Sequence, residues 1–221
     1  MKKIAIFLAV VILVGTSVIS LESQVYGQSD RKVLMIIREG RSSDPDLMIK
    51  MEVGTMNVLL KKAGFGVVIA SLSGQDVSGP TQKIEKLLKL SEIKLEDYVG
   101  VIIPCMGVPE AIASPEMVTT VKDILAKDKL VAASNGGVTV LAKAGLLKGK
   151  KYAFYTGPAD SGFGHYFDIT DLEGATYSGQ GVVQDGKIIT GGGCPSSEAN
   201  RGIQNRTLEL TQTFIAAIKP K

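Results

Sequence analysis

The fold is decided by the stretch Leu130-Val131-Ala132-Ala133-Ser134-Asn135-Gly136-Gly137-Val138-Thr139-Val140-Leu141-Ala142-Lys143-Ala144-Gly145. A short apolar run leads through a glycine-rich corner into residues that favour helix, and a glycine then ends them. This order is typical of a nucleophile elbow, a strained strand-to-helix turn that pushes one side chain out above a sheet. The apex residue is Asn135, whose amide is no nucleophile but tolerates left-handed backbone. A β-hairpin is the alternative, because Asn-Gly between two apolar runs is a strong hairpin signal.

Strands and helices alternate along the rest of the chain. Apolar runs predict strands at 32–37, 66–70 and 99–104, and helices are expected from Asp44 to Gly64 and from Ser114 onward. We also expect a short edge helix at 81–90, short β segments between 151 and 190, and a last helix from near Ser197 to before Pro220. Such alternation predicts an α/β fold, with a mostly parallel sheet, helices on both faces and a small antiparallel extension.

The N-terminus has the pattern of a secretory signal. Lys2 and Lys3 precede the apolar run 4–14, and small residues then offer cleavage sites near Ser20 or Gly27. We therefore expect a signal peptide over 1–27 and a single exported domain, periplasmic or secreted, over 28–221. An uncleaved membrane anchor is the alternative, but the apolar span is shorter than the roughly 20 residues that a bilayer requires. In both cases we expect the domain to lie outside the cytoplasm. If the signal is cleaved, we expect no stable membrane span to remain.

Composition narrows the possible functions. The 221 residues are 45% hydrophobic and 21% charged, enough for one domain with a substantial core. The net charge of +3 is spread without a basic run, so no nucleic-acid binding is expected. His165, the single histidine, and two cysteines are too few to predict a metal site, and no cofactor is expected.

Two motifs around the corner resemble the ThiJ/PfpI family, which includes the Parkinson-associated deglycase. The family typically has A-A-x-C-[HA]-G and then G-L-L-x-G-[RK]; this chain has residues 132–137 (AASNGG) and 145–150 (GLLKGK). Further similar segments follow in order at 32–37, 61–64, 98–104 and 185–190. The resemblance implies a flavodoxin-like three-layer sandwich, the fold of class I glutamine amidotransferases, and makes a homodimer possible. It also favours the elbow over the hairpin and places Asn135 where relatives carry their nucleophilic cysteine.

The resemblance also implies the other site residues. Glu52 takes the place of the acid on the first helix that shares a proton with the cysteine, although a surface glutamate is the alternative. Tyr155 stands where some relatives have a histidine, with an ordinary core or rim tyrosine as the alternative. The expected pocket is lined by Cys105, Met106, Gly136, Gly137, Tyr155 and Cys194. Ser134 is expected to point into the sheet packing. The polar loop 38–43 is expected to be solvated, with a position over the pocket as the alternative.

The two cysteines are the candidates for a disulfide. Cys105 follows the strand that ends in Pro104, and Cys194 lies in a segment that borders the site in relatives. An exported chain with two cysteines invites a bridge, which would stabilise the fold by roughly 4 kcal/mol in the chain-entropy model. Two buried free thiols are the alternative.

Two functions remain in competition. Loss of the nucleophile normally lowers an enzyme's rate by orders of magnitude, which favours a non-catalytic protein that binds an unknown small molecule or a partner. The alternative is a hydrolase or lyase that acts on small carbonyl compounds or glycated substrates, with Glu52 activating water. Relatives that retain the cysteine are described as deglycases, glyoxalases, peptidases or chaperones.

Overall fold

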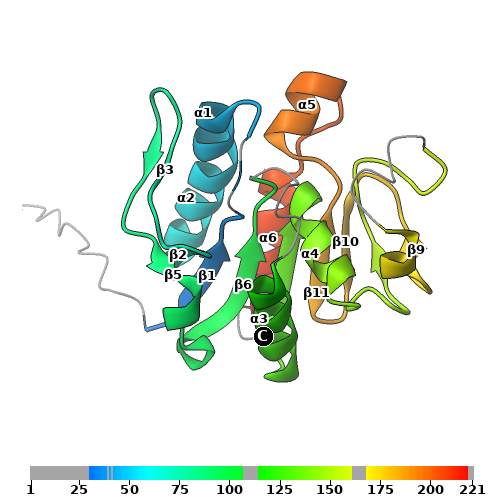
Figure 1. The fold of residues 1–221 in the computed structure, drawn as a ribbon, viewed down its shortest axis with the longest axis horizontal. Helices are drawn as coiled ribbons and strands as arrows, with labels where there is room; N and C mark the ends of the chain where they lie inside the picture. Colours follow the sequence, from blue (N-terminus) through cyan, green and yellow to red (C-terminus); the bar gives the residue numbers. More distant parts are fainter. Residues whose placement is uncertain (1–29, 39, 41, 107–113, 161–167, 219–221) are drawn as a thin grey trace, which may run out of the picture.

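The computed structural model describes residues 30–38, 40, 42–106, 114–160 and 168–218. The expected signal segment and His165 lie outside these residues. Seven strands form the central sheet, in the order β10-β11-β7-β6-β1-β2-β5 (Figure 1). They are β1 (Lys32–Ile36), β2 (Gly66–Ser71), β5 (Leu88–Lys89), β6 (Tyr98–Ile103), β7 (Leu130–Ser134), β10 (Val182–Asp185) and β11 (Ile188–Gly191). Every neighbouring pair is parallel except β10 with β11, which confirms the predicted fold class.

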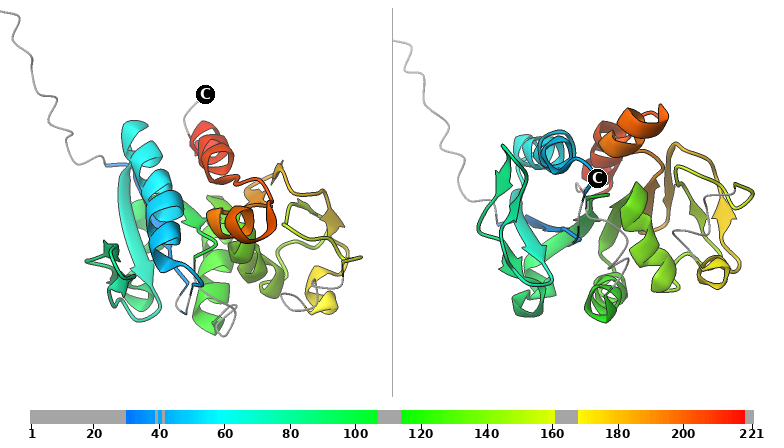
Figure 2. Two further views of the ribbon diagram at one scale, coloured as in Figure 1. Left: turned by 90° about the horizontal axis from the view of Figure 1, so that it is seen from above. Right: turned by 45° about the horizontal axis from the view of Figure 1, so that its top comes forward.

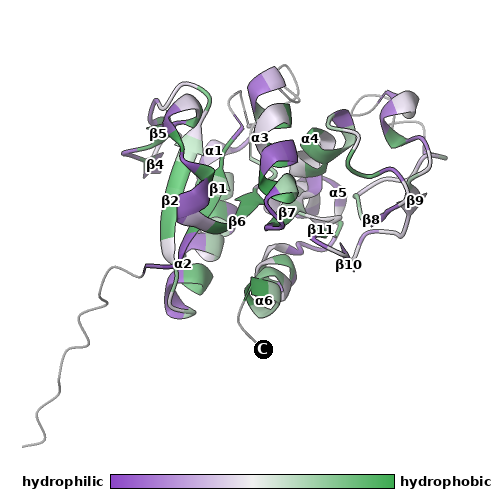
Figure 3. Cartoon of the chain, turned by 90° about the horizontal axis from the view of Figure 1, so that it is seen from below, coloured by the Kyte–Doolittle hydropathy of each residue, from purple (hydrophilic) through white to green (hydrophobic). Residues whose placement is uncertain are grey.

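Helices cover both faces of the sheet because successive side chains of each buried strand point to opposite faces. Val33 and Met35 of β1 pack with α2 (Gly54–Lys62) and α6 (Thr207–Ile218). Leu34 and Ile36 pack with α3 (Pro115–Ala126) and α4 (Val138–Lys143). Figure 2 shows these two helix layers, and Figure 3 shows the apolar colouring of the central strands between them.

The first helix begins where the sequence predicts. Asp44 Oδ1 accepts a hydrogen bond of 2.9 Å from Leu47 N, and Pro45 occupies the first position of α1 (Pro45–Met48). A π-helical turn, η1 (Ile49–Val53), connects α1 to α2, and Gly64 follows the helix with φ of +87°. A π turn inserted in an α-helix often marks a functional site. Here it carries Glu52.

Two expected helices differ in the structure. Residues 81–90 form β4 (Lys83–Ile84), β5 and the start of η2 (Leu90–Glu92) instead of a helix. The Asp46 carboxylate binds Thr81 N and Gln82 N, and β4 pairs antiparallel with β3 (Val77–Ser78). These bonds, together with the pairing of β5 to β2, outweigh the weak amphipathic pattern.

The last expected helix is divided in two. α5 (Pro195–Arg201) ends at Gly202, which has φ of +67°, and α6 begins at Thr207. The glycine C-cap explains the break. Between 151 and 190, β8 (Lys151–Tyr152) and β9 (Thr176–Tyr177) pair parallel, so the antiparallel pairing in this part is that of β10 with β11. The remaining 3₁₀ turns are η3 (Leu95–Asp97), η5 (Asn135–Gly137) and η7 (Ile169–Leu172).

The corner at Asn135 is a strand-to-helix turn, and the hairpin alternative is wrong. β7 passes through η5 directly into α4. Asn135 has φ of +37°, the left-handed backbone expected at an elbow apex. Within the described residues, no helix has the length and apolar character needed to cross a bilayer.

Candidate functional site

The candidate site forms where three neighbouring parallel strands end. β11, β7 and β6 are adjacent, and their registers pair Gly191 with Ser134 and Ile103 with Ala133. The carboxyl ends of parallel strands meet at one edge of the sheet, where α/β proteins usually bind ligands. The loops that leave this edge carry Cys105 after β6, Asn135 after β7 and Cys194 after β11. Chain topology therefore brings the amide and both thiols together.

The two sulfur atoms are in contact with each other and with amide N–H groups. Both cysteines are free thiols, with Sγ atoms 2.9 Å apart. Asn135 Nδ2 lies 3.4 Å from Cys194 Sγ and 3.5 Å from Cys105 Sγ. Gly136 N donates to Cys105 Sγ at 3.4 Å, and Ser197 N donates to Cys194 Sγ. Cys194 is 1% exposed, whereas Cys105 is partly exposed.

The hydrogen bond between the two thiols shifts their pKa values in opposite directions. It lowers the pKa of Cys194 to about 6, helped by the donors Asn135 and Ser197 and opposed by burial. The same hydrogen bond, with burial, raises the pKa of Cys105 well above its ordinary value. Cys194 is therefore the more acidic of the two thiols.

Glu52 is fully buried beneath the Cys105 loop. Its Oε1 accepts from Cys105 N at 2.9 Å and from Ser134 Oγ at 2.7 Å, and its Oε2 accepts from Met106 N at 3.1 Å. Burial raises the pKa of Glu52 to about 8, and the charge at Cys194 adds to this, while the three hydrogen bonds oppose it. These contacts make Glu52 a positioning residue for the loop that carries Cys105.

Sequence reasoning missed two members of the site. Ser134 does not simply pack in the sheet, because its hydroxyl donates to Glu52. Arg38, expected in a solvated loop, is 4% exposed, and its Nη2 donates to Cys105 O at 2.5 Å. Burial lowers the pKa of Arg38, whereas Cys105, Glu52 and Cys194 raise it. The signal that could have revealed Arg38 is its position in the chain. It follows the carboxyl end of β1, which lies beside β6 at the edge of the sheet where the site forms.

The paired glycines of the corner allow close approach of the chain. A Cβ atom on Gly136 would collide with the Arg38 guanidinium, and one on Gly137 would lie 2.6 Å from Ile103 O. A side chain at Gly137 would force β6 and the corner apart, whereas one at Gly136 would displace the Arg38 guanidinium. Both glycines are buried, and Gly136 N contacts the Cys105 sulfur.

Tyr155 packs mainly within the core. It is 6% exposed, its ring centroid lies 4.9 Å from that of Phe154, and the Arg201 guanidinium stacks 5.0 Å from its ring. Its carbonyl accepts from Gln180 Nε2 at 2.8 Å. Met106 is 3% exposed and contacts Glu52 through its backbone N–H.

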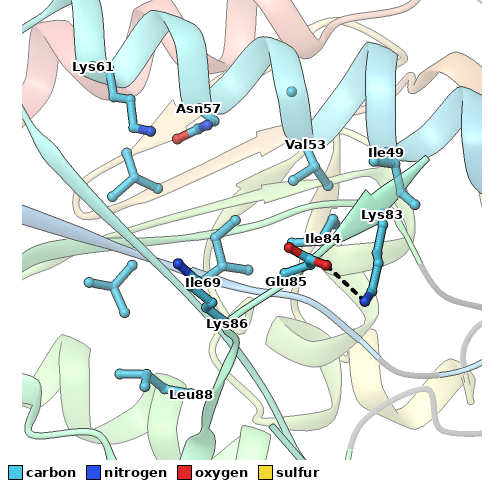
Figure 4. Close-up of a pocket in the computed structure, with 13 residues that line it drawn as sticks. Ile49, Val53, Asn57, Lys61, Ile69, Lys83, Ile84, Glu85, Lys86 and Leu88 are labelled. Carbon is cyan, nitrogen blue, oxygen red and sulfur yellow. Dashed lines mark ion pairs between the residues drawn. The ribbon is translucent and has the colours of Figure 1, made fainter. Parts of the chain in front are cut away.

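A separate groove lies on another part of the molecule, between the first helix and the β2–β5 edge (Figure 4). Its volume is about 560 Å³, and it is lined by Ile49, Val53, Gly54, Asn57, Lys61, Val67, Val68, Ile69, Lys83, Ile84, Glu85, Lys86 and Leu88. Lys83 and Glu85 form a 2.9 Å ion pair at its rim. In the described part of the chain, no group of three His, Cys, Asp or Glu side chains is placed to hold a metal.

Comparison with known proteins agrees with this architecture. The model of the DJ-1/PfpI family matches residues 31–199. An uncharacterized protein of Methanocaldococcus jannaschii is 31% identical over 195 residues, which cover 86% of this chain and 89% of that protein. DJ-1 protein homolog E of Arabidopsis thaliana is 35% identical over 100 residues, covering 45% of this chain and 23% of that protein.

Two solved structures share the fold. The ThiJ/PfpI domain protein of Brachyspira murdochii has a TM-score of 0.64 at 16% identity and covers 87% of this chain and 98% of that one. Drosophila melanogaster DJ-1beta has a TM-score of 0.61 at 19% identity, with 86% of this chain and 92% of that one covered. Because the family model matches most of the sequence, this chain belongs to the DJ-1/PfpI family.

Proposed function

We propose that this chain is an exported DJ-1/PfpI-family domain that binds a small polar molecule at the elbow without covalent catalysis there. The proposal rests on Asn135. An amide at the apex cannot form the covalent adducts that a thiol forms, and its left-handed backbone suits the turn. Its Nδ2 group is directed at the two sulfur atoms.

The chemistry of the ligand follows from the other end of the same amide. Asn135 Oδ1 is buried and has no hydrogen-bond partner among the described residues. An unsatisfied buried acceptor costs roughly 1–3 kcal/mol, which a ligand O–H or N–H would recover. Cys105 beside it is partly exposed. We therefore expect a small ligand with a hydrogen-bond donor, such as a hydroxylated or amide compound.

The enzymatic alternative is hydrolase or lyase chemistry on carbonyl compounds through Glu52 and water. A pKa of about 8 would suit proton transfer near neutral pH. We place it second because both Glu52 oxygens already accept hydrogen bonds, three in all, whereas Asn135 Oδ1 accepts none among the described residues. A general base must come within hydrogen-bond reach of the proton it removes.

One experiment separates the two functions. The purified protein and its Glu52→Gln variant are incubated with methylglyoxal and with peptide substrates. We expect no turnover by either. Robust turnover by the wild type that the substitution abolishes would overturn the binding proposal.

A second measurement tests binding directly. Small molecules that co-purify with the protein are identified by mass spectrometry and compared with those from Asn135→Ala. Asn57→Ala is the matched control, because it removes an amide from the separate groove. A ligand retained by Asn57→Ala and lost by Asn135→Ala supports the proposal. Equal retention by all three proteins would contradict it.

A further inference from the structure

We propose that Cys105 and Cys194 form a redox couple, a dithiol that a hydroperoxide converts to an intramolecular disulfide and that small thiols reduce again. This activity is distinct from ligand binding at Asn135. It assigns a function to the two thiols, which the binding proposal leaves without one.

The two sulfur atoms already lie close to bonding distance. The sulfurs are 2.9 Å apart, so the gap need close by only about 0.9 Å to reach an S–S bond of about 2.05 Å. Cys105 follows β6 and Cys194 follows β11, on either side of β7. The sheet therefore holds the pair in place, and forming the bond requires no rearrangement of strands.

Hydrogen bonds to the Cys105 loop fix its sulfur further. Glu52 accepts from the N–H of Cys105, and Arg38 donates to its carbonyl. Both partners are buried. The peptide groups on either side of the Cys105 side chain are thus anchored, which keeps its sulfur beside that of Cys194 in the reduced form.

Hydrogen-bond donors around the sulfurs stabilise the reduced form. N–H groups of Asn135, Gly136 and Ser197 are directed at the two sulfurs, and the buried Arg38 guanidinium lies nearby. Such donors stabilise a thiolate, and a stabilised thiolate makes the corresponding disulfide easier to reduce. A purely structural disulfide needs no such donors. The arrangement therefore favours a reversible couple over a permanent brace.

Exposure assigns the two roles. Cys105 is partly exposed and Cys194 is 1% exposed, so a small hydroperoxide meets Cys105 first. The Cys194 thiolate accepts the Cys105 proton across the sulfur contact as the Cys105 sulfur attacks a peroxide oxygen. The S–O bond forms, the O–O bond breaks, and the second oxygen leaves as hydroxide, which solvent protonates to water or, for an organic hydroperoxide, to an alcohol.

The disulfide then forms between the two cysteines. The Cys194 sulfur attacks the Cys105 sulfenic acid, the S–S bond forms and the S–O bond breaks. The hydroxide that leaves takes up the Cys194 proton and departs as water. Two thiols and one hydrogen peroxide thus give one disulfide and two waters, a two-electron oxidation of sulfur with the peroxide as oxidant. Two equivalents of a small thiol return the pair to its reduced form by disulfide exchange.

The test uses the fact that the chain has only two cysteines. The reduced protein is treated with hydrogen peroxide and quenched with an alkylating reagent, and its intact mass is then measured. We expect loss of two hydrogens, loss of both alkylation sites together, and full recovery with dithiothreitol. In Cys194→Ser the sulfenic acid should persist on Cys105 and be trapped by dimedone. In Cys105→Ser the reaction with peroxide should slow at least about tenfold, because the exposed sulfur is gone.

The contradicting outcomes are distinct. Oxygen addition to one cysteine without the hydrogen loss would overturn the couple, as would a disulfide that resists dithiothreitol in the folded protein. Complete resistance to peroxide, under conditions that oxidise the urea-unfolded chain, would also overturn it. None of these bears on ligand retention at Asn135, so the failure of one proposal is distinguishable from the failure of the other.

Discussion

Asn135 combines two requirements in one residue. Its backbone lies in the left-handed region, which asparagine tolerates better than most side chains, and its amide donates to both sulfurs. A change at this position therefore alters the turn and the sulfur environment together. Separating the two effects requires a pair of substitutions that both remove the amide.

Comparison of Asn135→Gly with Asn135→Ala isolates the backbone contribution. Both variants lose the contacts with sulfur, but only alanine resists a φ of +37°. We expect Asn135→Ala to be less stable than Asn135→Gly by about 1 kcal/mol in urea unfolding. Equal stability of the two variants would show that the turn carries no such strain.

Glu52 should make stability depend on pH in an unusual direction. Its pKa is about 8 in the folded protein against an ordinary value of 4.5, so between these values the folded state binds more protons. The free energy of unfolding should then fall as pH rises, by up to about 1.4 kcal/mol per pH unit. Cys194, with its pKa lowered to about 6, has the opposite effect above pH 6. The change in the free energy of unfolding between pH 4.5 and pH 6 therefore reports on Glu52.

In Glu52→Gln this slope should flatten. The variant should also be less stable at pH 5 by roughly 1–3 kcal/mol, because its amide N–H₂ would face the N–H of Met106 or Cys105. Urea unfolding at several pH values, with a reducing agent present, measures both effects. An unchanged slope between pH 4.5 and 6 would show that Glu52 titrates normally.

At the scale of the elements, strong local signals predicted structure and weak ones did not. Asp44, Pro45 and Gly64 fix the limits of the first helix through capping and backbone geometry. The π turn η1 and the strands of segment 81–90 have no such local signal. They depend on contacts with distant residues, such as the bonds from Thr81 and Gln82 to Asp46.

Asp46 should hold the β3–β4 hairpin against the first helix. Its carboxylate accepts from Thr81 N, Thr81 Oγ1 and Gln82 N, and these bonds lower its pKa. In Asp46→Ala we expect faster amide hydrogen exchange through the hairpin while the central strands keep their protection. Asp44→Ala is the matched control, because it removes a cap of the same helix and costs about 1 kcal/mol without releasing the hairpin. Unchanged exchange in the hairpin of Asp46→Ala would contradict the proposed anchor.

At the scale of the whole molecule, the site follows from topology. The order β11-β7-β6 places three loops that are distant in sequence at one edge of the sheet. The closeness of Cys105, Asn135 and Cys194 to one another could therefore be anticipated once the strands were assigned. Arg38 and Ser134 could not be assigned roles in the same way, because their contacts depend on where individual side chains point. Neither residue type signals burial by itself.

Export is a prediction about the whole chain. Expression of the full sequence in a secreting bacterial host should give a mature protein that begins after Ser20 or Gly27, because the apolar run is too short for a stable anchor. Intact mass and N-terminal sequencing measure this. A full-length chain retained in the membrane fraction would favour the anchor instead. Sedimentation of the mature form then tests the expected homodimer.

We infer that the Asn135 amide and both thiols act as one electrostatic unit. Titration of the native protein by the ultraviolet absorbance of thiolate tests it most directly. We predict that one thiolate forms with a midpoint near pH 6, and that Asn135→Gly moves this midpoint upward because a donor to sulfur is lost. A wild-type midpoint at the ordinary cysteine pKa of 9, unchanged by the substitution, would contradict the account.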